Sequence, residues 1–441
     1  MASKYPVARV GEVCYVTDGA HAKVDRQPHG VPYLTSKNIG VGQLLLGQVD
    51  YISVNDYKRL FANSYKSQRR LSSGDVLVGI IGTFGNAYLY KKQDHFGVSS
   101  AVALLRPDQS RLDPRFLYYV VTSPIFRAAH GAHKAGSVQG YTNIPTIKEL
   151  PVPLPPLPEQ YAIAHILGTL DDKIELNRRM NETLEAIAQA LFKSWFVDFD
   201  PVRAKAEGRD TGLPPHIADL FPDGFEDSEL GEIPRWWTVG CLGDVTRLLG
   251  GFAFRSQDWM TEGIPVVKIG SVKPGLVDLD QVSYVSERVS QQAKRFQLNP
   301  GDLLIGMTGY VGEVGLVPPT QSLPLLNQRV GKFEPKQGGL DWGFIYCLTR
   351  RSEFKAAVET RAHGTAQANV SAEGILSVPT VLPPLQTRHA FGLICHPLLH
   401  RILASHGQSR TLVEVRDCLL PKLISGEIRL KDAKKITERA S

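Results

Sequence analysis

The chain has 441 residues and a mass of 48.6 kDa, more than one hydrophobic core usually organises, so we expect at least two domains. Hydrophobic residues make up 43 % of the chain, but no apolar run reaches about 18 residues. The start MASKYPVARVGEV lacks the layout of a signal peptide, so we expect a cytoplasmic protein without membrane spans. A net charge of +6 and a pI near 8.9 fit a nucleic-acid partner without establishing one.

The first predicted feature is a β-rich region that returns later in the chain. VGEVCYVTDGAHAK from Val10 returns as LGDVTRLLGGFAFR from Leu242, at an offset of 232 residues. Three further pairs follow in the same order, at offsets of 233, 227 and 228: VPYLTSKNIG with IPVVKIGSVK, LSSGDVLVGIIGTFGNAYL with LNPGDLLIGMTGYVGEVGL, and LDPRFLYYVVTSPIFRAA with LDWGFIYCLTRRSEFKAA. Conserved order with small drifts is what a duplicated domain with loop insertions produces.

The sequence pattern of each copy predicts buried strands followed by an extended connector. The runs DVLVGIIG and DLLIGMTG are short, apolar and punctuated by glycine, as in buried strands entered from a turn. The copies close with ELPVPLPPLPEQ and LSVPTVLPPLQTR. Proline continues neither a ladder nor a helix interior, so these strings separate each domain from the next segment of the chain.

A long helix is predicted after each connector. From Tyr161 to Phe196 a heptad pattern places apolar residues on one seam, and adding 228 keeps the register in the second copy despite Gly392, Pro397 and Gly407. We expect the two seams to pack against each other, although each helix could instead pack only on its own domain. The seam residues are Ile163, Leu170, Asn177, Leu184 and Leu191 at one heptad position, Ile166, Met180 and Ile187 at the other, and, in the second copy, Phe391, Leu398, Ser405, Leu412 and Leu419.

Motifs for chemistry are missing from the sequence. There is no GxxxxGK[ST] phosphate loop, GMTGYVGEVG lacks the spacing of a dinucleotide site, and no Pro-Pro pair is followed by an aromatic residue as in the Pro-Pro-aromatic string of adenine methyltransferases. The histidines show no HExxH spacing, and the five scattered cysteines never form CxxC. We therefore predict a binding protein with no catalytic residues and no metal site.

Candidate DNA-binding residues lie in the loops of both copies. Basic side chains flank the glycine-marked turns, where phosphates or base edges could be met, and residues that differ between the copies are the better base readers. A solvated loop remains the alternative for each. The set is Lys23, Arg26, Ser36, Lys37, Asn38, Thr83, Phe84, Asn86, Ser99, Ser100, Lys134, Ser137, Gln139, Tyr141, Arg255, Lys268, Ser271, Lys273, Thr308, Tyr310, Asn327, Gln328, Arg329, Thr365, Gln367 and Asn369.

Three long strings carry a family resemblance. PLPPLPEQYAIAHILGTLDDKIELNRRMNETLEAIAQALFKSWFVDFDPVRAKAEG, LFPDGFEDSELGEIPRWWTVGCLGDV and TLVEVRDCLLPKLISGEI resemble the specificity subunit of type I restriction-modification systems, over essentially the whole chain. The resemblance implies an α+β fold in which two α/β target recognition domains are joined by two long helices, forming an antiparallel coiled coil with pseudo-twofold symmetry. It implies recognition domains at 1–152 and 206–380, helical regions at 153–205 and 381–430, and a tail at 431–441. It also implies that Trp195 belongs to the interface of the first helical region.

The resemblance also implies partners. Each recognition domain would read half of a bipartite site on double-stranded DNA, and the helices would hold two methyltransferase subunits and two restriction subunits. S-adenosylmethionine and ATP would be bound by those partners, so no cofactor is expected on this chain. A self-contained methyltransferase or nuclease and a protein-only scaffold remain the alternatives.

Overall fold

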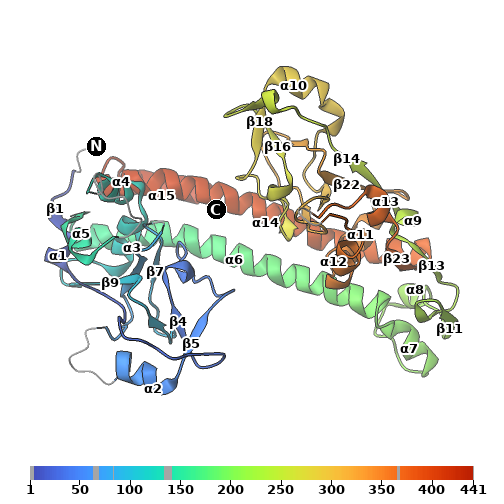
Figure 1. Cartoon of the computed structure of the whole chain (residues 1–441), viewed down its shortest axis with the longest axis horizontal. Coiled ribbons are helices and arrows are strands. Elements are labelled where there is room, and N and C mark those ends of the chain that lie inside the picture. Colours follow the sequence, from blue (N-terminus) through green and yellow to red (C-terminus); the bar gives the residue numbers. More distant parts are fainter. Residues whose placement is uncertain (1–3, 63–68, 83, 134–141, 365–367, 441) are drawn as a thin grey trace. The chain divides into compact units, whose positions relative to one another are not determined.

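The computed structural model describes residues 4–62, 69–82, 84–133, 142–364 and 368–440 (Figure 1). The chain divides into two compact units. Unit 1 comprises Met1–Ile174 and Thr411–Ser441, and unit 2 comprises Glu175–Arg410. Each unit thus contains one globular copy and one part of each long helix.

Unit 1 contains two four-stranded sheets. Buried side chains fill both faces of their central strands, as the apolar runs predict. The first sheet has the order β2 (Cys14–Asp18), β9 (Val102–Pro107), β6 (Val76–Gly79) and β7 (Ala87–Leu89). The second has the order β3 (Arg26–Gln27), β5 (Asp50–Ile52), β4 (Val31–Leu34) and β8 (Gly97–Val98), with β4 and β8 parallel. A separate pair joins β1 (Val7–Arg9) to β10 (Pro151–Pro153).

Short helices surround these sheets in unit 1. The Asp113 side chain accepts a hydrogen bond from the Phe116 backbone N–H at 2.9 Å, which caps the first turn of α3. Seven of the nine residues of this helix are buried in the first core. The helices are α1 (Val10–Val13), α2 (Val54–Tyr57), α3 (Pro114–Thr122), α4 (Pro124–His133), α5 (Ile144–Glu149) and α15 (Leu430–Ala440).

Unit 2 repeats the topology of unit 1. One sheet has the order β14 (Thr246–Gly250), β22 (Val330–Pro335), β19 (Leu303–Gly306), β20 (Val314–Leu316) and β17 (Gly275–Leu276), of which β17 is additional. The other has the order β15 (Trp259–Met260), β18 (Ser283–Val285), β16 (Ile264–Val267) and β21 (Leu325–Leu326), again with a parallel pair, β16 and β21. The strands β13 (Thr238–Cys241) and β23 (Pro379–Leu382) pair as β1 and β10 do.

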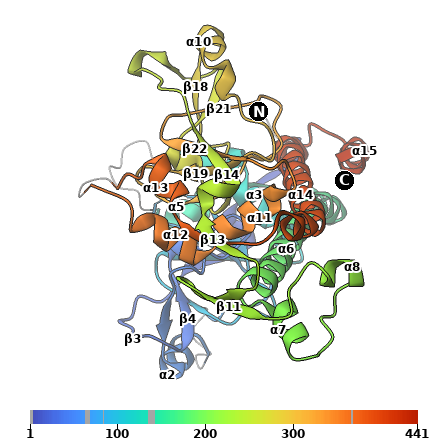
Figure 2. The same ribbon diagram turned by 90° about the vertical axis from the view of Figure 1, so that its right-hand side faces the viewer.

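The helices of unit 2 complete the repeat. They are α9 (Leu242–Val245), α10 (Glu287–Gln292), α11 (Asp341–Thr349), α12 (Ser352–Glu359) and α13 (Ala372–Leu376). The segment between α6 and β13 contributes α7 (Asp200–Ala206), α8 (Pro215–Ala218) and the hairpin β11 (Phe225–Ser228) with β12 (Gly231–Pro234). Figure 2 shows α7, α8 and β11 grouped beside the end of the preceding long helix. The duplication read from the sequence is therefore confirmed.

The two long helices are α6 (Leu157–Phe196) and α14 (Leu385–Ser425). In unit 1, Ile163, Leu167 and Leu170 of α6 share one hydrophobic cluster with Leu412, Leu419 and Leu423 of α14. The Arg416 guanidinium donates to the Asp171 carboxylate at 2.8 Å from one helix to the other. The seams in this unit pack together as predicted.

The parts of α6 and α14 in unit 2 run antiparallel. Asn177 contacts Gln408 and Ser409 near one end, and the Trp195 and Phe391 rings lie 5.8 Å apart near the other, so residue numbers rise along one helix as they fall along its partner. This pairing confirms the predicted antiparallel coil within the unit.

The seam departs from a strict heptad in the second half of α6. Ile187 is 43 % exposed, so its predicted place in the seam is wrong, and Leu184 and Leu191 are only half-buried. Ala188, Phe192 and Trp195 are buried. A straight helix drifts by about 20° per heptad against a 3.5-residue repeat, and the aromatic core of unit 2 favours the shifted face.

Helix α14 continues through its predicted interruptions. Its span includes Gly392, Pro397 and Gly407. A Cβ atom at Gly392 would lie 2.2 Å from the Leu340 carbonyl oxygen, so this glycine lets the backbone before α11 approach the helix. The glycine therefore serves packing and does not end the helix.

Candidate nucleic-acid interface

In unit 1, three loops gather where strands β4, β6 and β8 end. The Ser36 hydroxyl donates to the Ile81 carbonyl at 2.7 Å, which joins the loops after β4 and β6. The Ser99 backbone N–H donates to the Leu34 carbonyl at 2.9 Å, which joins the loop after β8 to the end of β4. We call the described residues of the loops 35–40, 80–86 and 99–101, without residue 83, loop edge 1. It brings together candidates that lie more than sixty residues apart in the sequence.

Unit 2 builds the equivalent arrangement at the ends of β16, β19 and β21. The Asn327 backbone N–H donates to the Val267 carbonyl at 3.2 Å, and the Met307 N–H donates to the Arg329 carbonyl at 3.1 Å. We call the loops 268–274, 307–313 and 327–329 loop edge 2. The Thr308 hydroxyl adds a fourth segment by donating to the Asn369 side-chain oxygen at 2.7 Å.

Many of the predicted residues are accessible on these units. The exposed ones are Lys23, Arg26, Lys37, Arg255, Tyr310, Gln328, Arg329 and Asn369. The half-buried ones are Ser36, Phe84, Asn86, Ser99, Ser100, Lys268, Lys273 and Thr308. Thr83, Lys134, Ser137, Gln139, Tyr141, Thr365 and Gln367 lie outside the described residues. Hydroxyl, amide and cationic groups are thus available at both edges for base edges and phosphates.

Two predicted residues have buried structural roles instead. Asn38 is 5 % exposed, and its amide donates to the carbonyls of Leu45 and Gln48 while its oxygen accepts from the Thr35 N–H. Ser271 is fully buried and donates to the Gln281 carbonyl. Both side chains hydrogen-bond to backbone groups of their own loops. Because they are buried, they are not accessible to DNA at the surface.

Two further candidates are constrained in different ways. Asn327 is 7 % exposed, and its side-chain oxygen accepts from the Arg329 N–H at 3.3 Å, which shapes the loop 327–329. Arg26 pairs with Asp50 at 3.2 Å, and the strand register places it level with Val31, the first residue of β4. Arg26 therefore lies away from the end of β4 at which loop edge 1 forms.

Aromatic rings hold two of the lysines at loop edge 2. The Lys268 ammonium lies 3.9 Å from the centre of the Trp259 ring, and the Lys273 ammonium lies 5.8 Å from the centre of the Tyr310 ring. Such cation–π contacts fix long side chains in place. Sequence reasoning missed Trp259, although an aromatic residue just before the strand Ile264–Val267 was a visible signal.

A buried tyrosine supports loop edge 1. The Tyr33 hydroxyl donates to the Ala20 carbonyl at 3.3 Å, and burial raises the pKa of this phenol. Tyr33 therefore stays neutral and keeps its donor at ordinary pH. The bond holds the end of β2 against β4, next to the loop 99–101.

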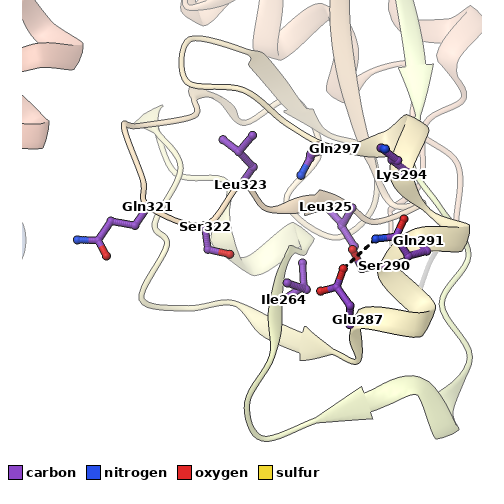
Figure 3. A pocket seen from close by; sticks show the side chains of 10 residues that line it. All are labelled: Ile264, Glu287, Ser290, Gln291, Lys294, Gln297, Gln321, Ser322, Leu323 and Leu325. Carbon is purple, nitrogen blue, oxygen red and sulfur yellow. Dashed lines mark hydrogen bonds between the residues drawn. The ribbon is translucent and has the colours of Figure 1, made fainter.

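A cavity of about 280 Å³ lies elsewhere in unit 2 (Figure 3). Its wall includes Ile264 at the start of β16, and the Gln291 amide donates to the Glu287 carboxylate at 2.8 Å beside it. Lys294 also lines this cavity. None of the predicted DNA-binding residues lines it, so it is separate from loop edge 2.

Within the described ranges, no group of three His, Cys, Asp or Glu side chains could hold a metal ion. Across the same part of the chain, no helix is long and apolar enough to cross a membrane.

The comparisons with known proteins agree with this geometry. Residues 3–186 and 234–408 match the family model described as type I restriction modification DNA specificity domain, which covers both repeats. The chain therefore belongs to this family. Its relatives include the HindI specificity subunit of Haemophilus influenzae, 26 % identical over 88 % of this chain and 94 % of that one, and the MjaIX specificity subunit of Methanocaldococcus jannaschii, 26 % identical over 72 % and 69 %.

A solved structure shares the fold. The crystal structure of a type I restriction-modification S subunit from M. genitalium is 15 % identical, covers 96 % of each chain and has a TM-score of 0.53. At this identity the likeness bears on the fold alone.

Proposed function

We propose that the chain is the DNA-specificity subunit of a type I restriction-modification complex, in which loop edges 1 and 2 each read one half of a bipartite DNA sequence. The observation that carries the proposal is the repeated edge itself. Two equivalent sets of loops, at the ends of equivalent strands, present different side chains. Because the two loop edges share a backbone arrangement but differ in side chains, they suit two half-sites of different base sequence.

Specificity at each edge would come from side chains that meet base edges in the major groove. Gln328 and Asn369 offer amides, which suit adenine, and the Arg329 guanidinium suits guanine. Affinity would come mostly from lysine and arginine contacts to phosphates and would fall steeply with salt. The domain limits 1–152, 153–205, 206–380 and 381–430 are part of this proposal.

The chemistry of the complex belongs, in this proposal, to partner subunits. Two modification subunits would bind S-adenosylmethionine and methylate adenines flipped out of the stack, and two restriction subunits would use ATP. The paired helices α6 and α14 would carry these subunits. This chain would contribute recognition and positioning, and no catalytic residue.

The test separates recognition from chemistry. Purified chain alone should transfer no methyl group from S-adenosylmethionine to DNA, and adding its modification subunits should give adenine methylation at one bipartite sequence. Methyl transfer by the chain alone would support a self-contained methyltransferase. Absence of DNA binding by the assembled complex at low salt would support a protein-only scaffold.

A further inference from the structure

Each unit clamps one loop of its edge in the same way. The loops 80–86 and 307–313 both contain a glycine with positive φ, Gly85 at 97° and Gly312 at 78°. A basic side chain from the next helix pair lies against each glycine. A Cβ atom at Gly85 would lie 2.8 Å from Arg127 Cγ, and one at Gly312 would lie 3.2 Å from Lys355 Cγ. Glycine is needed there for its conformation and for this close approach.

The charged ends of the two side chains bind the loops themselves. The Arg127 guanidinium of α4 donates to the Gly85 carbonyl at 3.3 Å. The Lys355 ammonium of α12 donates to the Glu313 carboxylate, whose side chain is only 17 % exposed. The charge of Lys355 is therefore already compensated inside the protein.

Apolar contacts hold the same loops from beneath. In unit 1 the Phe84 ring stacks on His130 with centroids 3.7 Å apart, and Phe126 lies beside it at 6.1 Å. In unit 2 the equivalent Val311 is buried in one cluster with Phe354 and Val358. Phe84 thus faces the helix, which makes it a support of the loop.

We propose that Arg127 and Lys355 are positioning residues for sequence readout, each acting through the loop of its own unit and neither touching DNA. The inference rests on the proposed function, because it assigns these residues to the two half-sites. It differs from the usual role of basic residues in a DNA-binding protein. A cation that contacts phosphate releases counterions when DNA binds, whereas a cation that contacts only its own protein does not.

The main experiment uses the full chain assembled with its modification subunits and the bipartite sequence that the wild-type complex methylates. Lys355→Met should weaken binding to that sequence about tenfold, the loss expected when one good base contact is misplaced. It should also relax the choice of bases in one half-site only, and Arg127→Leu should relax the other half. The slope of log affinity against log salt should stay unchanged in both variants.

A double-mutant cycle tests the route of action in unit 2. If Lys355 acts through Glu313, Lys355→Met should cost much less in a Glu313→Gln background than in the wild type. Lys355→Arg should keep most of the specificity, because it keeps the ion pair. Lys294→Met, at the cavity beside the start of β16, removes an exposed positive charge as the matched control and should leave both half-sites unchanged.

Two results would overturn the inference. Suppose that Lys355→Met reduces the slope of log affinity against log salt by about one and weakens DNA binding equally in the wild-type and Glu313→Gln backgrounds. Lys355 would then be a phosphate contact. Unchanged discrimination in both halves would show that the clamps do not govern readout. By contrast, a wild-type complex that shows no bipartite preference would contradict the proposed function instead.

Discussion

The Asn177 amide donates to the Gln408 side-chain oxygen at 3.0 Å from α6 to α14 within unit 2. Asn177 is 1 % exposed, and it also donates to the Ser409 hydroxyl at 3.1 Å. Ser405, the residue equivalent to Asn177 in the repeat, is buried beside it. The middle of the helical seam is therefore polar, where leucine would pack with less desolvation.

This polar layer should cost stability. Among the described residues, the Asn181 side-chain oxygen and the Ser405 hydroxyl are buried without a hydrogen-bond partner. A buried unsatisfied polar atom costs about 1–3 kcal/mol, and a polar seam residue generally selects one helix pairing at the expense of stability. We infer that the layer keeps α6 paired with α14 and not with a helix of another copy.

Asn177→Leu should therefore raise the unfolding temperature and promote self-association. We expect a gain of about 1 kcal/mol in stability, because an apolar side chain replaces the buried amide while the half-buried Gln408 and Ser409 can bond to water. Thermal unfolding and sedimentation velocity measure the two effects. Leu176→Ala, at a position 58 % exposed, is the control and should change neither. A strictly monomeric variant would contradict the pairing role.

A second prediction concerns the buried ion pair of Arg388 and Asp341. The Arg388 guanidinium donates to the Asp341 carboxylate at 3.0 Å, and the two side chains are 9 % and 0 % exposed. At the equivalent place in unit 1, the Gln160 amide bonds to the Asp113 backbone and the Pro155 carbonyl. Arg388→Gln would leave the Asp341 charge buried without its partner, which costs about 3–5 kcal/mol.

Tryptophan fluorescence during urea unfolding measures this loss. All five tryptophans of the chain, Trp195, Trp236, Trp237, Trp259 and Trp342, belong to unit 2, so the signal reports on that unit alone. Adding Asp341→Asn to Arg388→Gln should restore a large part of the stability, since the isolated charge is removed. Equal stability of the single and double variants would disprove the ion-pair explanation.

Unit 2 should lose stability in mild acid. Burial lowers the pKa of His396, with a smaller contribution from His400, and burial also lowers the pKa of His406. A histidine with a lowered folded pKa binds more protons when unfolded, so its contribution is complete above about pH 6.5, the unfolded value, and is lost as the pH falls below it. The urea midpoint of the tryptophan signal should therefore decrease below about pH 6.5.

A matched pair of variants checks the source of this dependence. His396→Gln should flatten the decline, because it removes one of the titrating groups. His21→Gln should not, because His21 belongs to unit 1 and its side chain is 59 % exposed. The same acid slope in His396→Gln and in the wild type would rule out His396 as a source.

The sequence predicted the duplication and the helix pairing well, because offsets and seam periodicity are one-dimensional signals. Ile163, Leu170, Leu412 and Leu419 are buried in the seam as predicted. Ile187 is not, because the buried face of α6 is decided by the globular core of unit 2. The order of strands in each sheet depends on long-range pairing that no local pattern encodes.

The sequence predicted the positions of the candidate loops better than the exposure of their individual side chains. Lys37 and Arg329 are exposed at their edges, but Asn38 and Ser271 are buried because each satisfies backbone groups of its own loop. Such local hydrogen bonds compete with any role at the surface. Lys355 stood out only as part of the repeated string LDWGFIYCLTRRSEFKAA, since nothing in the sequence joins it to Glu313.

The central claim, two independent readers on one chain, is tested most directly by exchanging residues 1–150 for the first domain of another family member. The methylated sequence of the resulting complex would be mapped by single-molecule sequencing of host DNA. We predict that one half of the bipartite motif changes while the other half stays as in the wild type. A change in both halves would contradict the account.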